Sequence, residues 1–134
     1  MTAPQTYAAF LDERRLILLF PLVFYNTGAR DYVVRDLRVR FGDESVDVPL
    51  AWERVRGGVD ASAYPTAELA APFSVPGRSR VRVFAEFERR PADRTVDARA
   101  HPLVLEGVTD QEDRWATLLR FNLDVSGQAA ETIQ

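Results

Sequence analysis

Five acidic side chains in two short turns are the residues that could hold a metal ion. Asp43 and Glu44 lie in one turn, and Asp110, Glu112 and Asp113 lie in the other. Ca²⁺ takes several oxygen ligands from such loops, and Greek-key order would bring the two turns to one end of the fold. The spacing matches no EF-hand, and acidic residues are common in solvated turns. We therefore expect ordinary turns and no cofactor, with a calcium cluster as the alternative.

Two aromatic side chains could bind carbohydrate. Trp52 and Tyr64 flank an irregular stretch, where exposed rings could act as stacking platforms for a sugar. Trp52 shares its parity with Val46, Val48 and Leu50, so we expect its burial in a core. Tyr64 is the ring that we expect to be exposed.

Nucleophilic catalysis lacks its usual partners in this sequence. The chain has one histidine and no cysteine, and a serine nucleophile needs a histidine as its base. His101 precedes Pro102 in a predicted strand, which indicates a structural or exposed side chain. Gly77-Arg78-Ser79-Arg80 begins like a nucleophile elbow, but it lacks the second glycine and leads into a strand. We therefore expect no enzyme activity.

Arginines recur at alternate positions in two places. Arg38 and Arg40 form one set, and Arg78, Arg80 and Arg82 form the other. Alternate residues of a strand share a face, so each set could contact phosphate or an acidic polymer. Outward strand faces are ordinarily charged, however, and three acidic residues are available as cross-strand partners: Asp36, Glu86 and Glu88. We expect ion pairs on solvated faces.

Composition narrows the class of protein. The chain has 134 residues and a formal net charge of −3, from 17 basic and 20 acidic side chains. A nucleic-acid-binding protein would show a strong basic excess or a concentrated basic stripe, so that class is not expected. The absence of cysteine removes disulfides and thiolate metal sites. The length suits a single domain, residues 1–134, with loose tails at 1–5 and 127–134.

No stretch of the sequence is expected to span a membrane. The longest apolar run, Leu16 to Tyr25, contains Pro21 and is too short to cross a bilayer. Met1 to Gln5 has no charged segment followed by an apolar core, so it does not resemble a secretory signal. We expect a soluble chain that is either cytoplasmic or the extracytoplasmic part of an anchored protein.

Hydrophobic alternation predicts β-strands through most of the chain, most clearly where Val33, Leu37, Val39 and Phe41 alternate with charged residues. Strands are predicted at residues 5–11, 16–25, 33–41, 46–52, 78–88 and 96–106. A last strand would place five apolar side chains on one face: Trp115, Leu119, Phe121, Leu123 and Val125. Residues 53–71 are irregular, although Thr66 to Ala71 could form a short helical turn. The pattern predicts an all-β, antiparallel β-sandwich of seven to eight strands.

Prolines and turn residues refine these strands. Residues 16–25 are apolar at both parities, as in a strand that is covered on both faces or changes sheets. Pro21 favours two pieces in different sheets, and Pro49 places residues 46–52 near an edge. Asn26-Thr27-Gly28 predicts an Asx turn in which Gly28 can take positive φ without steric cost, and Pro76-Gly77 predicts a type II turn. His101-Pro102 is expected to break or bulge its strand.

Three motifs carry a resemblance to a known class of domain. They are Leu22-x-Phe24-x-Asn26-Thr27-Gly28, Val34-x-x-Leu37-x-Val39-x-Phe41 and Val75-Pro76-Gly77-x-Ser79. Over residues 16–125 the chain resembles bacterial immunoglobulin-like β-sandwich domains of uncharacterised type, which often form the soluble part of envelope proteins. The resemblance implies an immunoglobulin-like sandwich and brings no catalytic residue.

These observations together favour a non-enzymatic scaffold or protein-interaction module, with the cell envelope as one setting. The alternative is a small-ligand module that binds carbohydrate or calcium through its loops.

Overall fold

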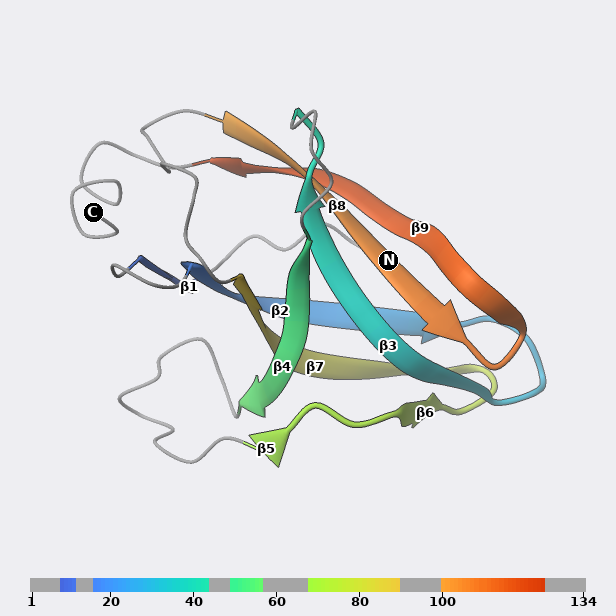
Figure 1. Ribbon diagram of the computed structural model, residues 1–134. Coiled ribbons are helices and arrows are strands. Elements are labelled where there is room, and N and C mark those ends of the chain that lie inside the picture. Colours follow the sequence, from blue (N-terminus) through green and yellow to red (C-terminus); the bar gives the residue numbers. More distant parts are fainter. Residues whose placement is uncertain (1–7, 12–15, 44–48, 57–67, 90–99, 125–134) are drawn as a thin grey trace.

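Nine β-strands and no helix form the part of the chain that the computed structural model describes, which is residues 8–11, 16–43, 49–56, 68–89 and 100–124 (Figure 1). The strands are β1 (Ala8–Leu11), β2 (Leu16–Asn26), β3 (Tyr32–Phe41), β4 (Leu50–Arg56), β5 (Glu68–Leu69), β6 (Phe73–Val75), β7 (Ser79–Arg89), β8 (Ala100–Thr109) and β9 (Glu112–Asp124). These ranges accordingly contain no helix long and apolar enough to cross a membrane. The predicted all-β class is confirmed.

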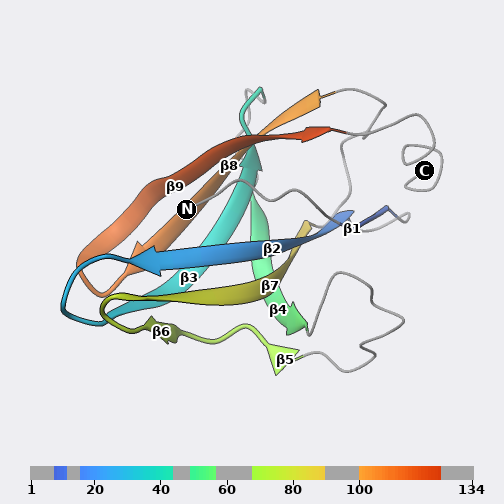
Figure 2. The same ribbon diagram turned by 180° about the vertical axis from the view of Figure 1, so that it is seen from behind.

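The strands pair antiparallel in one curled sheet (Figures 1 and 2). Its order is β1-β2-β7-β4-β3-β8-β9, with β5 beside β4 and β6 beside β3. β4 links two halves of this sheet. It pairs with β7 from Ala51 to Arg56 but with β3 only at Leu50 and Ala51. The β2–β7 half consequently lies across from the β3–β8–β9 half (Figure 2).

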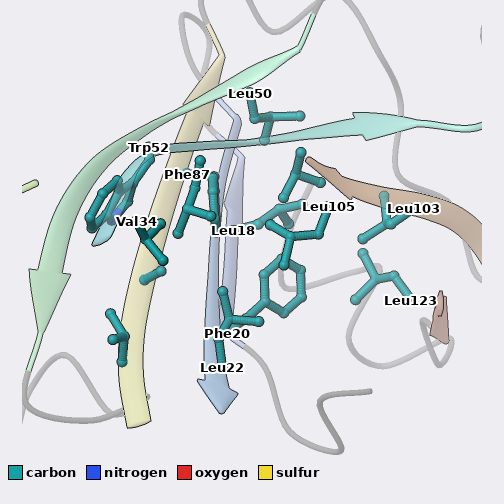
Figure 3. Close-up of a cluster of buried hydrophobic side chains, with 14 of the residues drawn as sticks. Leu18, Phe20, Leu22, Val34, Leu50, Trp52, Phe87, Leu103, Leu105 and Leu123 are labelled. Atoms are coloured by element: carbon teal, nitrogen blue, oxygen red, sulfur yellow. The ribbon is translucent and has the colours of Figure 1, made fainter. Parts of the chain in front are cut away.

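Aliphatic and aromatic side chains from both halves fill the space inside the curl (Figure 3). Phe20 on β2 packs edge-on against Phe121 on β9, with ring centroids 5.4 Å apart, and contacts Phe87 on β7 at 6.3 Å. Val83, Ala85 and Phe87 are buried, which confirms the alternation predicted for β7. Burial of each large apolar side chain stabilises the fold by about 1.5–3 kcal/mol, so this cluster holds the halves together.

β2 is one continuous strand, so the predicted division at Pro21 is wrong. It pairs with β7 at every position, with Pro21 opposite Phe84. β1 pairs with β2 only from Leu16 to Leu19, so no described strand lies beside Pro21 on that side, where its missing N–H costs no ladder bond. Leu18 and Leu19 are both 0% exposed although they face opposite ways. Cover on both faces therefore explains the apolar residues at both parities.

A β-bulge in β3 changes part of the predicted alternation. The register against β8 shifts between Val34 and Asp36. Leu37 and Val39 are buried as predicted, but beyond the shift Val34 faces the core at 1% exposure while Val33 is half-buried.

A second bulge, in β9, overturns the predicted position of a tryptophan. The register against β8 shifts between Leu119 and Thr117, and the extra residue, Leu118, packs against the core. A Cβ at Gly107 would lie 2.7 Å from Leu118 Cδ1, so glycine makes room for this side chain. The shift turns Trp115 to the outer face, whereas alternation predicts it inside with Leu119.

Three further expectations are corrected. β4 lies inside the sheet, between β7 and β3, and not near an edge. β5 pairs with β4 where a helical turn was expected near Thr66 to Ala71. β8 runs unbroken through His101 and Pro102 because both pair with β9. The predicted tails at 1–5 and 127–134 lie outside the described residues.

Candidate functional site

The candidate site is a groove on the outer face of β2 and β7, on the opposite side of these strands from the core. We call it the arginine groove, and it is lined by Val23, Tyr25, Arg78, Arg80 and Arg82. Two open hollows with volumes of about 570 and 390 Å³ share Tyr25 and Arg80 in their linings. The groove is thus a shallow surface and not an enclosed cavity.

Strand register places the side chains of the arginine groove beside one another. Val23 lies opposite Arg82, and Tyr25 lies opposite Arg80. Opposed residues in antiparallel strands have Cβ atoms about 4.5–5.5 Å apart. Tyr25 is 44% exposed and Val23 is half-buried. An aromatic ring and an aliphatic side chain therefore share one surface with guanidinium groups.

The arginines of the groove have no acidic partner, contrary to expectation. None of the three makes an ion pair with any residue of the described ranges. Of the predicted partners, Glu86 lies further along β7 and contacts Arg54, at an N–O distance of 3.8 Å. The groove therefore carries uncompensated positive charge in a chain whose net charge is −3.

Asn26 organises the turn at one end of the groove. Its Oδ1 accepts a hydrogen bond from the Gly28 N–H at 3.0 Å, which confirms the predicted Asx turn. Its Nδ2 donates to the carbonyls of Arg30 at 2.7 Å and Val75 at 3.0 Å, and so joins the β2–β3 turn to β6. Gly28 does not adopt the positive φ that glycine allows, and no other glycine of the described residues does.

Arg78 has a left-handed backbone, with φ of 56°. The predicted type II turn would put that conformation at Gly77, so the prediction is wrong by one residue. Gly77 is needed for a different reason: a Cβ there would lie 2.3 Å from the Ala29 carbonyl oxygen. The Arg78 N–H donates to the Gly28 carbonyl at 2.9 Å, which holds the two turns together. A non-glycine residue in this conformation costs about 1–2 kcal/mol.

Tyr32 closes the same end of β2. Its hydroxyl donates to the Tyr25 carbonyl at 3.0 Å. Partial burial raises the pKa of Tyr32 above its ordinary value, because removal from water disfavours the phenolate. The Tyr32 hydroxyl therefore stays a donor at neutral pH.

The two arginines of the other predicted set share one acidic partner, Glu106, which was not predicted. Arg38 and Arg40 both contact Glu106 on β8, with N–O distances of 2.9 and 3.3 Å. Arg38 also stacks on Trp115, with its guanidinium carbon 4.2 Å from the ring centroid. Pairing across β3 and β8 thus gives both arginines an acidic contact, as expected for an ordinary strand face.

The proposed calcium residues are only partly brought together. Asp110 lies at the β8–β9 turn, where its Oδ1 accepts from the Val33 N–H at the start of β3. Asp43 follows the other end of β3, one strand length away. The two acidic turns therefore do not share an end, and Glu44 lies outside the described residues. Glu112 and Asp113 stay beside Asp110, but no group of three possible metal ligands occurs in the described part of the chain.

The proposed carbohydrate residues are not brought together in the described residues. Trp52 is buried at 7% exposure, as expected, and packs edge-on against Phe73 at 5.8 Å. Tyr64 lies outside those residues. His101 is fully buried, with its ring 6.1 Å from that of Phe41, which fits the structural role expected of it.

Tyr25 and Val23 are site residues that the sequence analysis missed. Their signal was present in the double-parity run of β2, but only pairing with β7 shows that the odd positions share a face with the arginines. No family model matches this chain, and no curated protein is similar to it in sequence.

Proposed function

We propose that this chain is a non-enzymatic, immunoglobulin-like β-sandwich that acts as a protein-interaction module. On this proposal the arginine groove binds an extended segment of a partner protein. A setting in the cell envelope belongs to the same proposal and rests only on the sequence resemblance.

The sandwich arrangement is supported by the way that the two halves of the curled sheet share a core. Ring contacts cross between them, as at Phe20 and Phe121, and β4 is joined to β3 through only two residue pairs. Two sheets that pack face to face over a common core are the defining feature of this architecture.

One observation carries the interaction role: the arginine groove lies beside an open strand edge. Within the described residues, the part of β2 from Phe20 to Asn26 has no strand neighbour on the side away from β7. Extended peptides bind such edges through backbone hydrogen bonds, and neighbouring surface pockets select their side chains. Tyr25 and Val23 offer apolar contacts at this edge.

Affinity selection tests this role. A library of random peptides is selected on the immobilised wild-type protein and then counter-selected on Tyr25→Ala, whose fold is first checked by circular dichroism and thermal melting. Asn122→Ala, at an exposed position on β9, is the matched control surface. The proposal expects enriched peptides that bind wild type and Asn122→Ala but not Tyr25→Ala. The proposal would be refuted if the enriched peptides bound Tyr25→Ala as well as wild type, or if no peptide were enriched.

A further inference from the structure

We infer that the segment bound at the arginine groove is an acidic strand, with glutamate side chains at alternate positions, that adds to the open edge of β2. This inference rests on the proposed function and names the chemistry of the partner. Its basis is three unpaired arginines, the direction of the β2 backbone groups, and the backbone strain at Arg78.

Within the described strands, β2 has an unpaired edge from Phe20 to Asn26 that another strand can join. In an antiparallel ladder, alternate residues direct their N–H and C=O groups to the same neighbour. The Tyr25 carbonyl accepts a hydrogen bond from the Tyr32 hydroxyl, and from this bond we infer that the odd positions of β2 point their backbone groups away from β7. Pro21, which has no N–H, is also at an odd position. Val23 and Tyr25 therefore supply the donors at the edge, while Pro21 and Val23 supply the acceptors.

The arginines set the charge and spacing of the partner. Arg80 and Arg82 repeat every second residue on the outer face of β7, about 7 Å apart along the strand. A strand added to β2 would lie about 10 Å from β7, which is two strand spacings. Acidic side chains at every second residue of that strand share both the face and the period of the arginines. Long side chains are needed on both sides to span the distance, which favours glutamate over aspartate.

Three arginines without an acidic partner gather on this face, whereas Arg30 and Arg120, which also lack one within the described residues, lie outside the groove. Arg38, Arg40 and Arg54 have glutamates from this chain as partners, whereas the groove arginines have none within the described residues. Acidic residues outnumber basic ones by 20 to 17 in the whole sequence, so a lack of available acids does not explain the difference. The missing carboxylates are supplied by the partner, as charge complementarity across interfaces requires.

Arg78 is the second, independent observation. It follows Gly77 in a left-handed conformation that glycine adopts without strain. Arginine at this position costs backbone energy and puts a third guanidinium at the end of the groove. Strained residues of this kind cluster at binding sites, where the function of the side chain offsets the cost of the strained backbone.

The direct test uses a fluorescein-labelled peptide, as long as the open edge of β2, that alternates valine and glutamate. Fluorescence anisotropy measures its binding to wild type, to Arg80→Glu, to Arg82→Glu and to the control Arg120→Glu. Arg120 is exposed on β9 and its reversal changes net charge by the same amount as either groove variant. We expect each groove variant to weaken binding about tenfold or more, since a charge-assisted contact is lost, and the control to change it less than about twofold.

Three comparison peptides sharpen the result. A peptide with lysine in place of glutamate should bind the Arg80→Glu, Arg82→Glu double variant better than wild type. An aspartate peptide should bind wild type more weakly than the glutamate peptide. A glutamate peptide that is N-methylated on the residues facing β2 should not bind, whereas methylation on the other residues should leave binding unchanged.

Failure of the inference and failure of the proposed function are distinguishable. If the glutamate peptide does not bind, or Arg120→Glu weakens it as much as Arg80→Glu does, the acidic strand is refuted. Equal binding of inorganic polyphosphate, or indifference to N-methylation, would mean a general anion surface and would also overturn it. If the library nonetheless yields Tyr25-dependent peptides without acidic residues, the proposed function stands and only the partner chemistry is wrong.

Discussion

Asn26 is a single side chain on which the geometry of the arginine groove depends. Asn26→Ala removes three hydrogen bonds, to Gly28 N–H, Arg30 C=O and Val75 C=O, from a residue that is only 8% exposed. A typical hydrogen bond contributes about 1 kcal/mol, and a carbonyl left buried without a partner costs about 1–3 kcal/mol. Arg30 and Gly28 are exposed, so their backbone groups can bond to water in the variant, which lowers the total loss of stability. We expect a loss of about 2–4 kcal/mol in the free energy of unfolding.

Urea denaturation followed by tryptophan fluorescence measures this loss. With an m-value of about 2 kcal/mol per molar urea, the midpoint should fall by about 1–2 M with the slope unchanged. Asn26→Asp is the sharper companion variant, because it keeps the acceptor for Gly28 but points a second oxygen at the two carbonyls. We expect it to be at least as unstable as Asn26→Ala. The control is Asn122→Ala, which should stay within about 0.5 kcal/mol of wild type because Asn122 is exposed.

The reasoning would be refuted if the free energy of unfolding of Asn26→Ala stayed within about 0.5 kcal/mol of wild type, because a buried carbonyl that loses its partner costs more than that. It would equally be refuted if Asn26→Asp matched wild type at neutral pH, since the two donated bonds would then contribute nothing. A loss confined to the slope would indicate a changed unfolded state instead.

Three further outcomes are expected. Gly77→Ala should destabilise the fold by more than about 2 kcal/mol in the same urea assay, because the new Cβ would lie 2.3 Å from a backbone oxygen. Gly42→Ala is the control, because the nearest atom to its new Cβ would be 3.6 Å away. Equal losses of stability in the two variants would contradict the argument. Glu106→Gln should lower the free energy of unfolding by about 1–2 kcal/mol, because it leaves Arg38 and Arg40 facing each other. Glu112→Gln, in an exposed ion pair, should lower it by less than about 0.5 kcal/mol. A larger loss for Glu112→Gln than for Glu106→Gln would count against the ion-pair network. Because burial raises the pKa of Tyr32, the unfolded state loses this proton first, so the free energy of unfolding falls as pH rises above the ordinary value of 10.0. Tyr32→Phe should make that fall shallower in urea titrations, and an unchanged slope with pH would contradict the assignment.

Much of the strand pattern could be predicted from local alternation. Apart from Phe84, β7 alternates from Arg80 to Glu88, and the alternation correctly places Val83, Ala85 and Phe87 in the core. Alternation failed where an extra residue entered a ladder, as at Leu118, because a bulge reverses parity without changing the local composition. Trp115 was consequently assigned to the wrong face.

The candidate site was only half visible in the sequence. The period-two arginines could be seen, but their partners could not, since pairing depends on which strands are neighbours. Arg38 and Arg40 face Glu106 because β3 pairs with β8, and Arg80 faces Tyr25 because β7 pairs with β2. The same motif thus gives an ion-pair network in one place and an open cationic groove in the other.

The all-β class, the inward and outward faces of the regular strands, and the Asx turn at Asn26 follow from the residue pattern. Each of these depends on residues close together in the chain. The tertiary structure alone decided the strand order, the bulges, the continuity of β2 through Pro21 and the left-handed backbone at Arg78. Those features depend on contacts between segments far apart in the chain, such as the approach of Gly77 to Ala29. Local periodicity does not predict such contacts.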